Sequence, residues 1–456
     1  MLGALSAAAF ALLGAAPAHA AGLDISVEHR LRALSYKNVD LVPGSHQGAS
    51  FLSQSTRLGF TFKDIPLGDA AGEPQTLDIL LKIRALGVTG STTTFSPPFD
   101  RAAAQYPSAT YVPFLENAAL AAHGLGGIPW DITIGRQSYT QGSGLLLDDE
   151  GAGLSGVSLR GALPWWDMKA EGFAFEADHP MQGSGALDLF GGTLEVPSEG
   201  SWQLNQLIER DKRDQTVAPN GCPSGGTTGC AVSGATRWFS SLHYHMHYGP
   251  IVFDGEGALE RGAATPTGPN AAQNHITFKG NAEVVKAKWI QTFYHSKTTG
   301  RQVQGYARVS FARGSGDDAA TPTTDESFFP SHGKRYDGLE REGFGQLFAA
   351  TPYDAFAGRS TGTVSGLPAG SSGIISLGLG VTPPAWKGLV LDVDYYLYQA
   401  DRGGSTAALG KELDLRLHHD IRDRFSISAS AALFSGGALY GDASARRYML
   451  EAVGRF

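Results

Sequence analysis

The chain has 456 residues, a formal net charge of −8 and a mean hydropathy of −0.13. A negative net charge excludes a broadly basic nucleic-acid-binding protein. Beyond the first twenty residues, no apolar run is long enough for a transmembrane helix, which needs about eighteen residues. If the chain crosses a membrane, we therefore expect it to cross as a β-barrel.

Residues 1–20, MLGALSAAAFALLGAAPAHA, form an apolar run that ends in the small-x-small sequence Ala-His-Ala. Signal peptidase cuts after this pattern, so we expect the mature chain to begin at Ala21. No Lys or Arg precedes the apolar run, which departs from the usual signal peptide. The prediction is a signal peptide at 1–20 and one exported barrel at 21–456.

Strict period-two alternation appears early in the chain. From Asp24 to Ala33 the odd positions are mostly apolar and the even positions are polar or charged, and the segment from Thr76 to Ala85 repeats the pattern. Such alternation is typical of strands with one face toward lipid and the other toward water. A soluble sandwich alternates too, so the number and spacing of segments must decide.

About eighteen segments of this kind follow one another, the first near 23–35 and the last near 446–456. An even number places both ends in the periplasm, with short turns there and long loops outside, notably 211–235 and 314–372. The longer loop could fold inward as a partial plug or lie over the mouth. The predicted fold class is all-β, an antiparallel transmembrane β-barrel of about eighteen strands in the outer membrane of a Gram-negative cell.

Cys222 and Cys230 are the only cysteines and lie in a loop rich in Gly, Pro and Thr. In an oxidising compartment this short spacing predicts a disulfide. Closing so small a loop stabilises by about 2–3 kcal/mol.

The segment HYHMHY places His243, His245 and His247 on one strand face, a spacing at which histidines can share a metal. No Cys or fixed carboxylate stands nearby in sequence, so we interpret the row as lumen lining. No metal or other cofactor is predicted.

The predicted inner face carries charges of both signs, with basic residues concentrated in the first six strands and acidic residues in the last four. A barrel of this size encloses water, and guanidinium groups pair with carboxylates and phosphates in a fork. We predict an electropositive constriction, the alternative being paired charges that only keep the wall solvated. The candidate pore-lining residues are Arg30, Arg57, Lys82, Arg84, Arg136, Arg160, Glu412 and Asp414.

Enzymatic motifs are missing from the sequence: it has no zinc-protease helix, P-loop, CxxCH or GxSxG. His419 and Asp420 are adjacent in a predicted turn, which is poor geometry for a catalytic pair. We predict no catalytic residues and no enzyme.

The chain ends YMLEAVGRF, with Phe456 sharing a face with Gly454, Ala452, Leu450 and Tyr448. Outer-membrane proteins present such a closing strand to their assembly machinery. We therefore expect barrel assembly machinery and outer-membrane lipid as partners.

Several segments resemble one family. The matching segments are 135–137 (GRQ), 156–160 (GVSLR), 315–318 (SGDD), 329–330 (FP), 394–396 (DYY) and 410–415 (GKELDL). In this order and spacing they resemble the alginate export family of outer-membrane channels. The resemblance implies an Arg-rich constriction that passes an anionic polysaccharide, with Arg136 and Arg160 as lumen bases and Glu412 and Asp414 as their acidic counterparts.

The functional prediction is a channel for passive passage of polar or anionic solutes, with export of an anionic, alginate-like polysaccharide as its specific form. Export would need a periplasmic partner to supply direction. Two alternatives remain: an uptake porin for small carboxylates or aromatics, and a sheath barrel that encloses a periplasmic partner protein.

Overall fold

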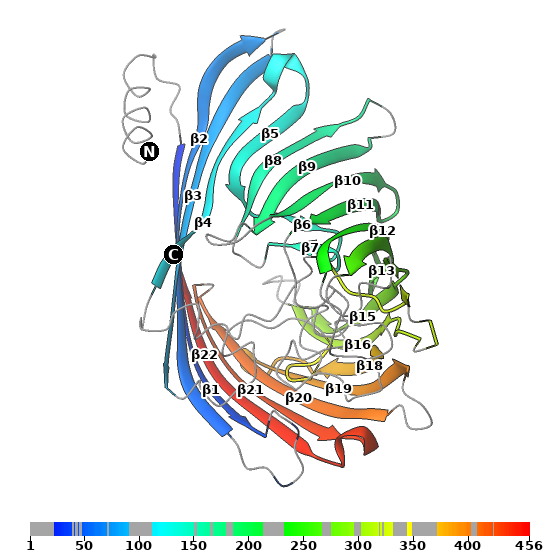
Figure 1. The fold of residues 1–456 in the computed structure, drawn as a ribbon. Coiled ribbons are helices and arrows are strands. Elements are labelled where there is room, and N and C mark those ends of the chain that lie inside the picture. The colour runs from blue at the N-terminus through cyan, green and yellow to red at the C-terminus, as the bar shows by residue number, and fades with distance from the viewer. Residues whose placement is uncertain are drawn as a thin grey trace.

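The structure is a computed structural model in which eighteen strands, counted over the described residues, pair antiparallel with their neighbours. The first strand, β1 (Gly22–Lys37), also pairs with the last, β22 (Ser444–Arg455), so the sheet closes into a barrel (Figure 1). The predicted fold class is confirmed. The structure describes residues 22–456 except 39–40, 42–43, 45–47, 71–72, 91–111, 150–152, 165–166, 179–185, 213–231, 267–274, 296–301, 319, 322, 332–343, 349–371, 403–407 and 423.

The sixteen barrel strands between β1 and β22 follow the chain in order. They are β2 (Gly48–Ala70), β3 (Glu73–Gly90), β4 (Val112–His123), β5 (Trp130–Gln137), β8 (Leu154–Ala162), β9 (Lys169–Asp178), β10 (Leu187–Pro197), β11 (Ser201–Asp211), β12 (Val232–Tyr248), β13 (Ile251–Pro266), β15 (Asn281–His295), β16 (Gln302–Gly314), β18 (Ser372–Thr382), β19 (Leu389–Arg402), β20 (Ala408–Ile421) and β21 (Phe425–Gly436). Short elements in the connections are β6 (Thr140–Gln141), β7 (Leu147–Asp148), β14 (Ile276–Phe278), β17 (Thr324–Asp325), η2 (Leu125–Gly127) and η5 (Ala438–Tyr440). Among the described residues, no helix is long and apolar enough to cross a membrane.

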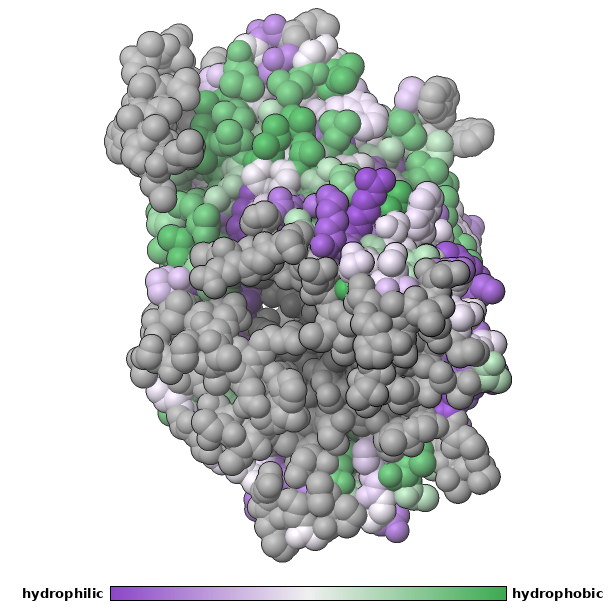
Figure 2. Space-filling view, viewed as in Figure 1, coloured by the Kyte–Doolittle hydropathy of each residue, from purple (hydrophilic) through white to green (hydrophobic). Residues whose placement is uncertain are grey.

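The barrel wall shows the alternation that the sequence predicts. On β1, Leu23 and Ile25 point outward and are 50% and 56% exposed, whereas Arg32 is buried on the inner side. Hydrophobic residues cover much of the upper part of the face seen in Figure 2. An apolar outside and a polar inside are the arrangement that a membrane-spanning barrel requires.

The two ends of the barrel differ in the length of their connections. Residues 198–200 and 249–250 make short turns at one end, which we call the short-turn end, while 138–153 and 315–371 connect strands at the other. Short turns face the periplasm in bacterial barrels. The predicted signal peptide at 1–20 and the predicted disulfide between Cys222 and Cys230 lie outside the described residues.

The apolar core lies inside the barrel, between the wall and the segments folded against it. Leu145 and Phe328 come from these segments and are fully buried. Phe348 stacks on Phe434 of β21 with ring centroids 4.7 Å apart and contacts Tyr398 of β19 at 4.8 Å. Burying one such side chain stabilises by about 1.5–3 kcal/mol, so packing holds these segments within the lumen.

Candidate functional site

Cationic side chains gather on the inner face of adjacent strands on both sides of the barrel closure, from β22 through β1 to β4. The register places Glu28 of β1 directly opposite Arg57 of β2 and Arg455 of β22. Cross-strand neighbours on one face are close enough to interact. We call this set the basic wall: Arg30, Arg32, Arg57, Lys82, Arg84 and Arg455, with the carboxylates Glu28, Glu116 and Glu451.

Glu28 is the centre of one part of the basic wall. Its Oε1 lies 3.4 Å from both Arg30 Nη2 and Arg57 Nη1, and its Oε2 lies 3.0 Å from Arg455 Nε. Glu451 pairs with Arg32 and lies 3.9 Å from Arg30 Nε. The pairing of β1 with β22 thus links the two ends of the chain through ion pairs.

Glu116 reaches the basic wall because of a β-bulge in β4. Lys82 faces Asn117 and the next residue, Ile83, faces Leu115, which leaves Glu116 as the extra residue. A bulge re-aims the side chain of its extra residue. The Glu116 carboxylate accordingly lies 3.2 Å from Arg57 Nε and 3.1 Å from Lys82 Nζ, with only 2% of its side chain exposed.

The basic wall holds six cations and three carboxylates, so positive charge is in excess within this set. Arg84 is buried and donates from Nε to Ser55 Oγ at 3.3 Å. The side chains of Arg30, Arg57 and Lys82 are partly exposed. Such a surface attracts anions over a distance and can pair with carboxylates at contact.

Arg136 does not join the basic wall, contrary to the sequence analysis. The register places it opposite Ala118 and Ser155, on the face that carries the outward Ile134. Strict alternation from Ile134 puts Arg136 on that same side. Its guanidinium donates to the carbonyl oxygen of Leu115 at 3.0 Å and to Ser155 Oγ at 3.3 Å.

Arg160 lies on the inner face of β8, as alternation predicts, and is exposed there. Its cross-strand neighbours are Asp131 of β5 and Glu171 of β9. This position is separated from the basic wall by β5, so Arg160 forms a distinct charged site.

The connection between β5 and β8 folds into the lumen as a small hairpin, β6 and β7 (Figure 1). Gln141 donates from Nε2 to the carbonyl oxygens of Gly192 and Gln206 at 2.9 and 3.2 Å. Ser143 donates its backbone N–H to Glu256 Oε2 at 2.9 Å. These bonds fasten the hairpin to the wall formed by β10, β11 and β13.

The predicted 314–372 loop also meets the inner wall, in its described parts 315–331 (without 319 and 322) and 344–348. Arg237 of β12 lies between Glu209 of β11, at 2.8 Å, and Glu260 of β13, at 3.0 Å. Arg237 Nη1 donates to the Phe329 carbonyl oxygen at 2.7 Å, and the Phe329 N–H donates to Glu260 at 2.9 Å. We call these four residues the Arg237 clasp.

Glu412 and Asp414 lie on the inner face of β20 but do not line open lumen. Both are buried, and Glu412 accepts the backbone N–H groups of Gln346, Leu347 and Phe348 at 2.7 to 2.8 Å. Segment 344–348 thus covers Glu412. The predicted pairing with Arg136 and Arg160 is therefore replaced by a fastening of the loop.

The histidine row meets a carboxylate that sequence spacing did not indicate. His243 Nε2 and His245 Nδ1 lie 3.0 and 3.1 Å from the same Oδ2 of Asp254, on the neighbouring strand β13. Over the described residues, no three His, Cys, Asp or Glu side chains are arranged to hold a metal. The row is part of the charged lumen lining.

Several contributors to the lumen were missed in the sequence, Glu451 and Lys288 among them. Glu451 belongs to the face of the closing strand opposite Phe456, and Lys288 alternates with the outward Trp289. Alternation alone could have placed both on the inner face. It could not have shown which charges they meet.

No family model and no curated protein sequence matches the chain. By fold it is similar to Pseudomonas aeruginosa OpdK solved with vanillate, with a TM-score of 0.53 and 13% identity over 95% of this chain and 98% of that chain. It is similar to P. aeruginosa OccK2 (OpdF) in complex with glucuronate, with a TM-score of 0.53 and 12% identity over 95% and 98%. Acinetobacter baumannii OccAB4 has a TM-score of 0.55 and 10% identity over 95% and 98%.

At sequence identities this low, the similarity is evidence for the fold and not for the function. These likenesses lend no support to alginate export in particular. With its closed sheet, apolar outer wall and charged lumen, the chain has the fold of an outer-membrane porin and is an outer-membrane β-barrel.

Proposed function

We propose that this protein is an outer-membrane porin that takes up small carboxylates through its lumen, guided by the basic wall. The observation that carries the proposal is the excess of six cations over three carboxylates within the basic wall. This is the uptake alternative of the sequence analysis rather than polysaccharide export.

The basic wall suits transient binding. Arg57 already pairs with Glu28 and Glu116, so an incoming carboxylate competes with ion pairs at contact distance. Conduction requires binding strong enough to favour entry and weak enough to permit release. Partly paired arginines meet both requirements, and passage follows the concentration gradient because no energy-coupling motif is present.

The lumen segments favour small solutes over a polymer. The β6–β7 hairpin and segments 315–331 and 344–348 occupy part of the barrel cross-section. Among the proteins of similar fold, OpdK was solved with vanillate and OccK2 with glucuronate, both small carboxylates. These observations support carboxylate uptake better than export of an alginate-like polysaccharide.

The test is the reversal potential of the purified barrel in planar bilayers under a salt gradient, followed by permeation of benzoate and glucuronate into liposomes. We expect anion-selective current and entry of both solutes. Arg57→Gln should reduce selectivity, and Arg136→Gln is the matched control because Arg136 lies outside the basic wall.

Two outcomes would contradict the proposal. Absent or cation-selective current would favour the sheath alternative, in which a partner protein fills the lumen. Current blocked by oligouronate, without entry of the small carboxylates, would favour polysaccharide export.

A further inference from the structure

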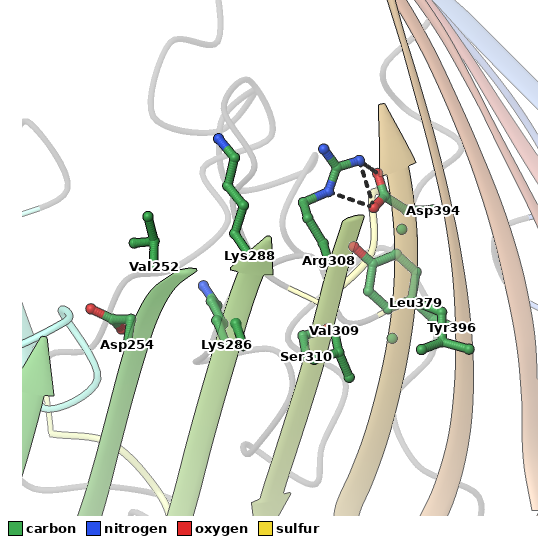
Figure 3. Close-up of a pocket in the computed structure, with 13 residues that line it drawn as sticks. Val252, Asp254, Lys286, Lys288, Arg308, Val309, Ser310, Leu379, Asp394 and Tyr396 are labelled. Atoms are coloured by element: carbon green, nitrogen blue, oxygen red, sulfur yellow. Dashed lines mark hydrogen bonds and ion pairs between the residues drawn. The ribbon is translucent and has the colours of Figure 1, made fainter. Parts of the chain in front are cut away.

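A second group of cationic side chains lines a recess of about 310 Å³ in the inner wall, formed by β13, β15, β16, β18 and β19 (Figure 3). Among the eighteen barrel strands β2 is the second and β15 the twelfth. The recess therefore lies across the lumen from the basic wall. Its volume is at the small end of the range of ligand pockets, roughly 300–1,000 Å³.

Two inward-facing glycines of β18 create the recess. A Cβ on Gly380 would lie 1.9 Å from Asp394 Oδ1, and a Cβ on Gly378 would lie 2.6 Å from Tyr396 Cε1. Because β18 presents no side chain here, Arg308 of β16 reaches Asp394 of β19 over it, with Nη2 2.9 and 3.1 Å from the two carboxylate oxygens. Figure 3 shows this ion pair spanning the strand between them.

Arg308 is satisfied by its own partners, since it also lies 3.2 Å from Asp392. Lys288, its cross-strand neighbour on β15, differs from it. Within the described part of the chain Lys288 makes no ion pair, and its Nζ lies 3.9 Å from the ring centroid of Tyr306. In Figure 3 its side chain extends away from the strand. Among the described residues, Lys288 therefore has an aromatic ring but no carboxylate as its partner.

Hydroxyl donors accompany this charge. Tyr396 and Ser310 line the recess, and neither hydroxyl has a hydrogen-bond partner among the described residues. An ammonium pairs with a carboxylate, and hydroxyls on the same wall can donate hydrogen bonds to further oxygens of a solute. The two carboxylates of the lining already have partners, Asp394 in Arg308 and Asp254 in His243 and His245.

The recess lies beside the lumen segment 344–348. Lys286 Nζ is 5.2 Å from the Phe344 ring centroid, and the Tyr398 hydroxyl donates to the Phe344 carbonyl oxygen at 2.7 Å. Because β15 runs toward the short-turn end, Lys288 lies one step closer to that end than Lys286. A solute that had passed this segment would meet Lys288 next.

We infer that the recess is a carboxylate-binding subsite, in which the Lys288 ammonium pairs with the carboxylate and the hydroxyls of Tyr396 and Ser310 supply further hydrogen-bond donors along the wall of the recess. The inference rests on the proposed function, which supplies carboxylates to the lumen. It adds one binding position for the solute, which lies across the lumen from the basic wall and next to segment 344–348. The solute binds there before it is released.

The location is tested by crystals of the full barrel soaked in 4-bromobenzoate. We expect an anomalous bromine peak in the recess of the wild type and none in Lys288→Met. Peaks only elsewhere, or a peak that persists in Lys288→Met, would overturn the inference. If inorganic phosphate displaced 4-bromobenzoate from the recess as effectively as benzoate does, the assignment of the subsite to carboxylates would be wrong.

The kinetics are tested by benzoate-induced current blocks in single channels. Lys288→Met should shorten the block at least about tenfold, the loss typical of a hydrogen bond to a charged group, and Tyr396→Phe should shorten it less. Lys63→Met, a lysine of β2 paired with Asp24, is the matched control and should leave it unchanged.

The two proposals fail separately. Carboxylate entry with identical block times in wild type and Lys288→Met would remove the subsite and leave the porin. Bromine in the recess without carboxylate entry would remove the porin and leave the subsite. If Lys288→Met does not fold, Lys288→Gln provides the block times and the wild-type soak decides the location.

Discussion

The Arg237 clasp and the basic wall both contain arginine–glutamate ion pairs, yet their arrangement differs. Arg237 is 2% exposed and lies between two buried glutamates, Glu209 and Glu260, and the loop backbone. In the basic wall, cations outnumber carboxylates and residues such as Arg30 and Arg57 stay partly exposed. Stoichiometry and burial, rather than residue type, separate the clasp from the surface that we propose to guide solutes.

The physical reason is desolvation. A charge removed from water must find its compensation within the protein, which fixes its partners. A partly hydrated charge can exchange partners at little cost. The clasp is thus suited to hold the loop at Phe329, and the basic wall to let a solute compete for its cations.

The largest effect is expected in the clasp. Arg237→Met leaves Glu209 and Glu260 buried without a counter-charge, which should cost about 3–5 kcal/mol of the free energy of unfolding. Urea titration of the barrel in detergent micelles, followed by tryptophan fluorescence, measures it. A loss below about 1 kcal/mol, as for an exposed pair, would mean that burial does not distinguish the clasp from exposed ion pairs.

Glu412 is a second buried anchor of a loop segment and gives a second test of the comparison. Glu412→Gln removes the charge that accepts three backbone N–H groups of segment 344–348, and each bond to a charged group contributes about 1.5–3 kcal/mol. We expect a larger mean conductance with frequent brief closures, and faster cleavage by proteinase K. Asp420→Asn, on an exposed part of β20, is the control. Unchanged conductance would mean that Glu412 is not the anchor.

Substitutions in the basic wall should change the ion selectivity of the barrel rather than its free energy of unfolding. Glu28→Gln removes a carboxylate and should raise the anion-to-cation permeability ratio, whereas Arg57→Gln should lower it. One unit charge about 4 Å from an ion in water contributes about 1 kcal/mol, which is several-fold in the ratio. Reversal potentials measure both. Shifts in the same direction would contradict an electrostatic role.

The smallest effect is expected at an exposed ion pair. Lys212 lies 2.6 Å from Asp188, but its side chain is 62% exposed. Lys212→Met should change the free energy of unfolding by less than about 1 kcal/mol. The same urea titration serves as the matched comparison for Arg237→Met, and a loss comparable to that variant would show that burial is not what matters.

The sequence alone was sufficient to assign strands and faces. Side chains of a strand alternate between its two sides, so the apolar neighbours of Arg30, Lys82 and Arg160 place all three on the inner face. The same rule, applied from Ile134, places Arg136 on the outer face. The predicted pore-lining position of Arg136 is therefore wrong.

Only the tertiary structure decided which charges meet, because closure joins strands that are distant in the chain. Arg32 pairs with Glu451, 419 residues away. A single bulge turns Glu116 toward Arg57. Loop segments bury Glu412, while two glycines of β18 open the recess near Lys288. Alternation records the side of the wall that a residue faces, whereas its neighbours depend on register, closure and loops, which no local pattern contains.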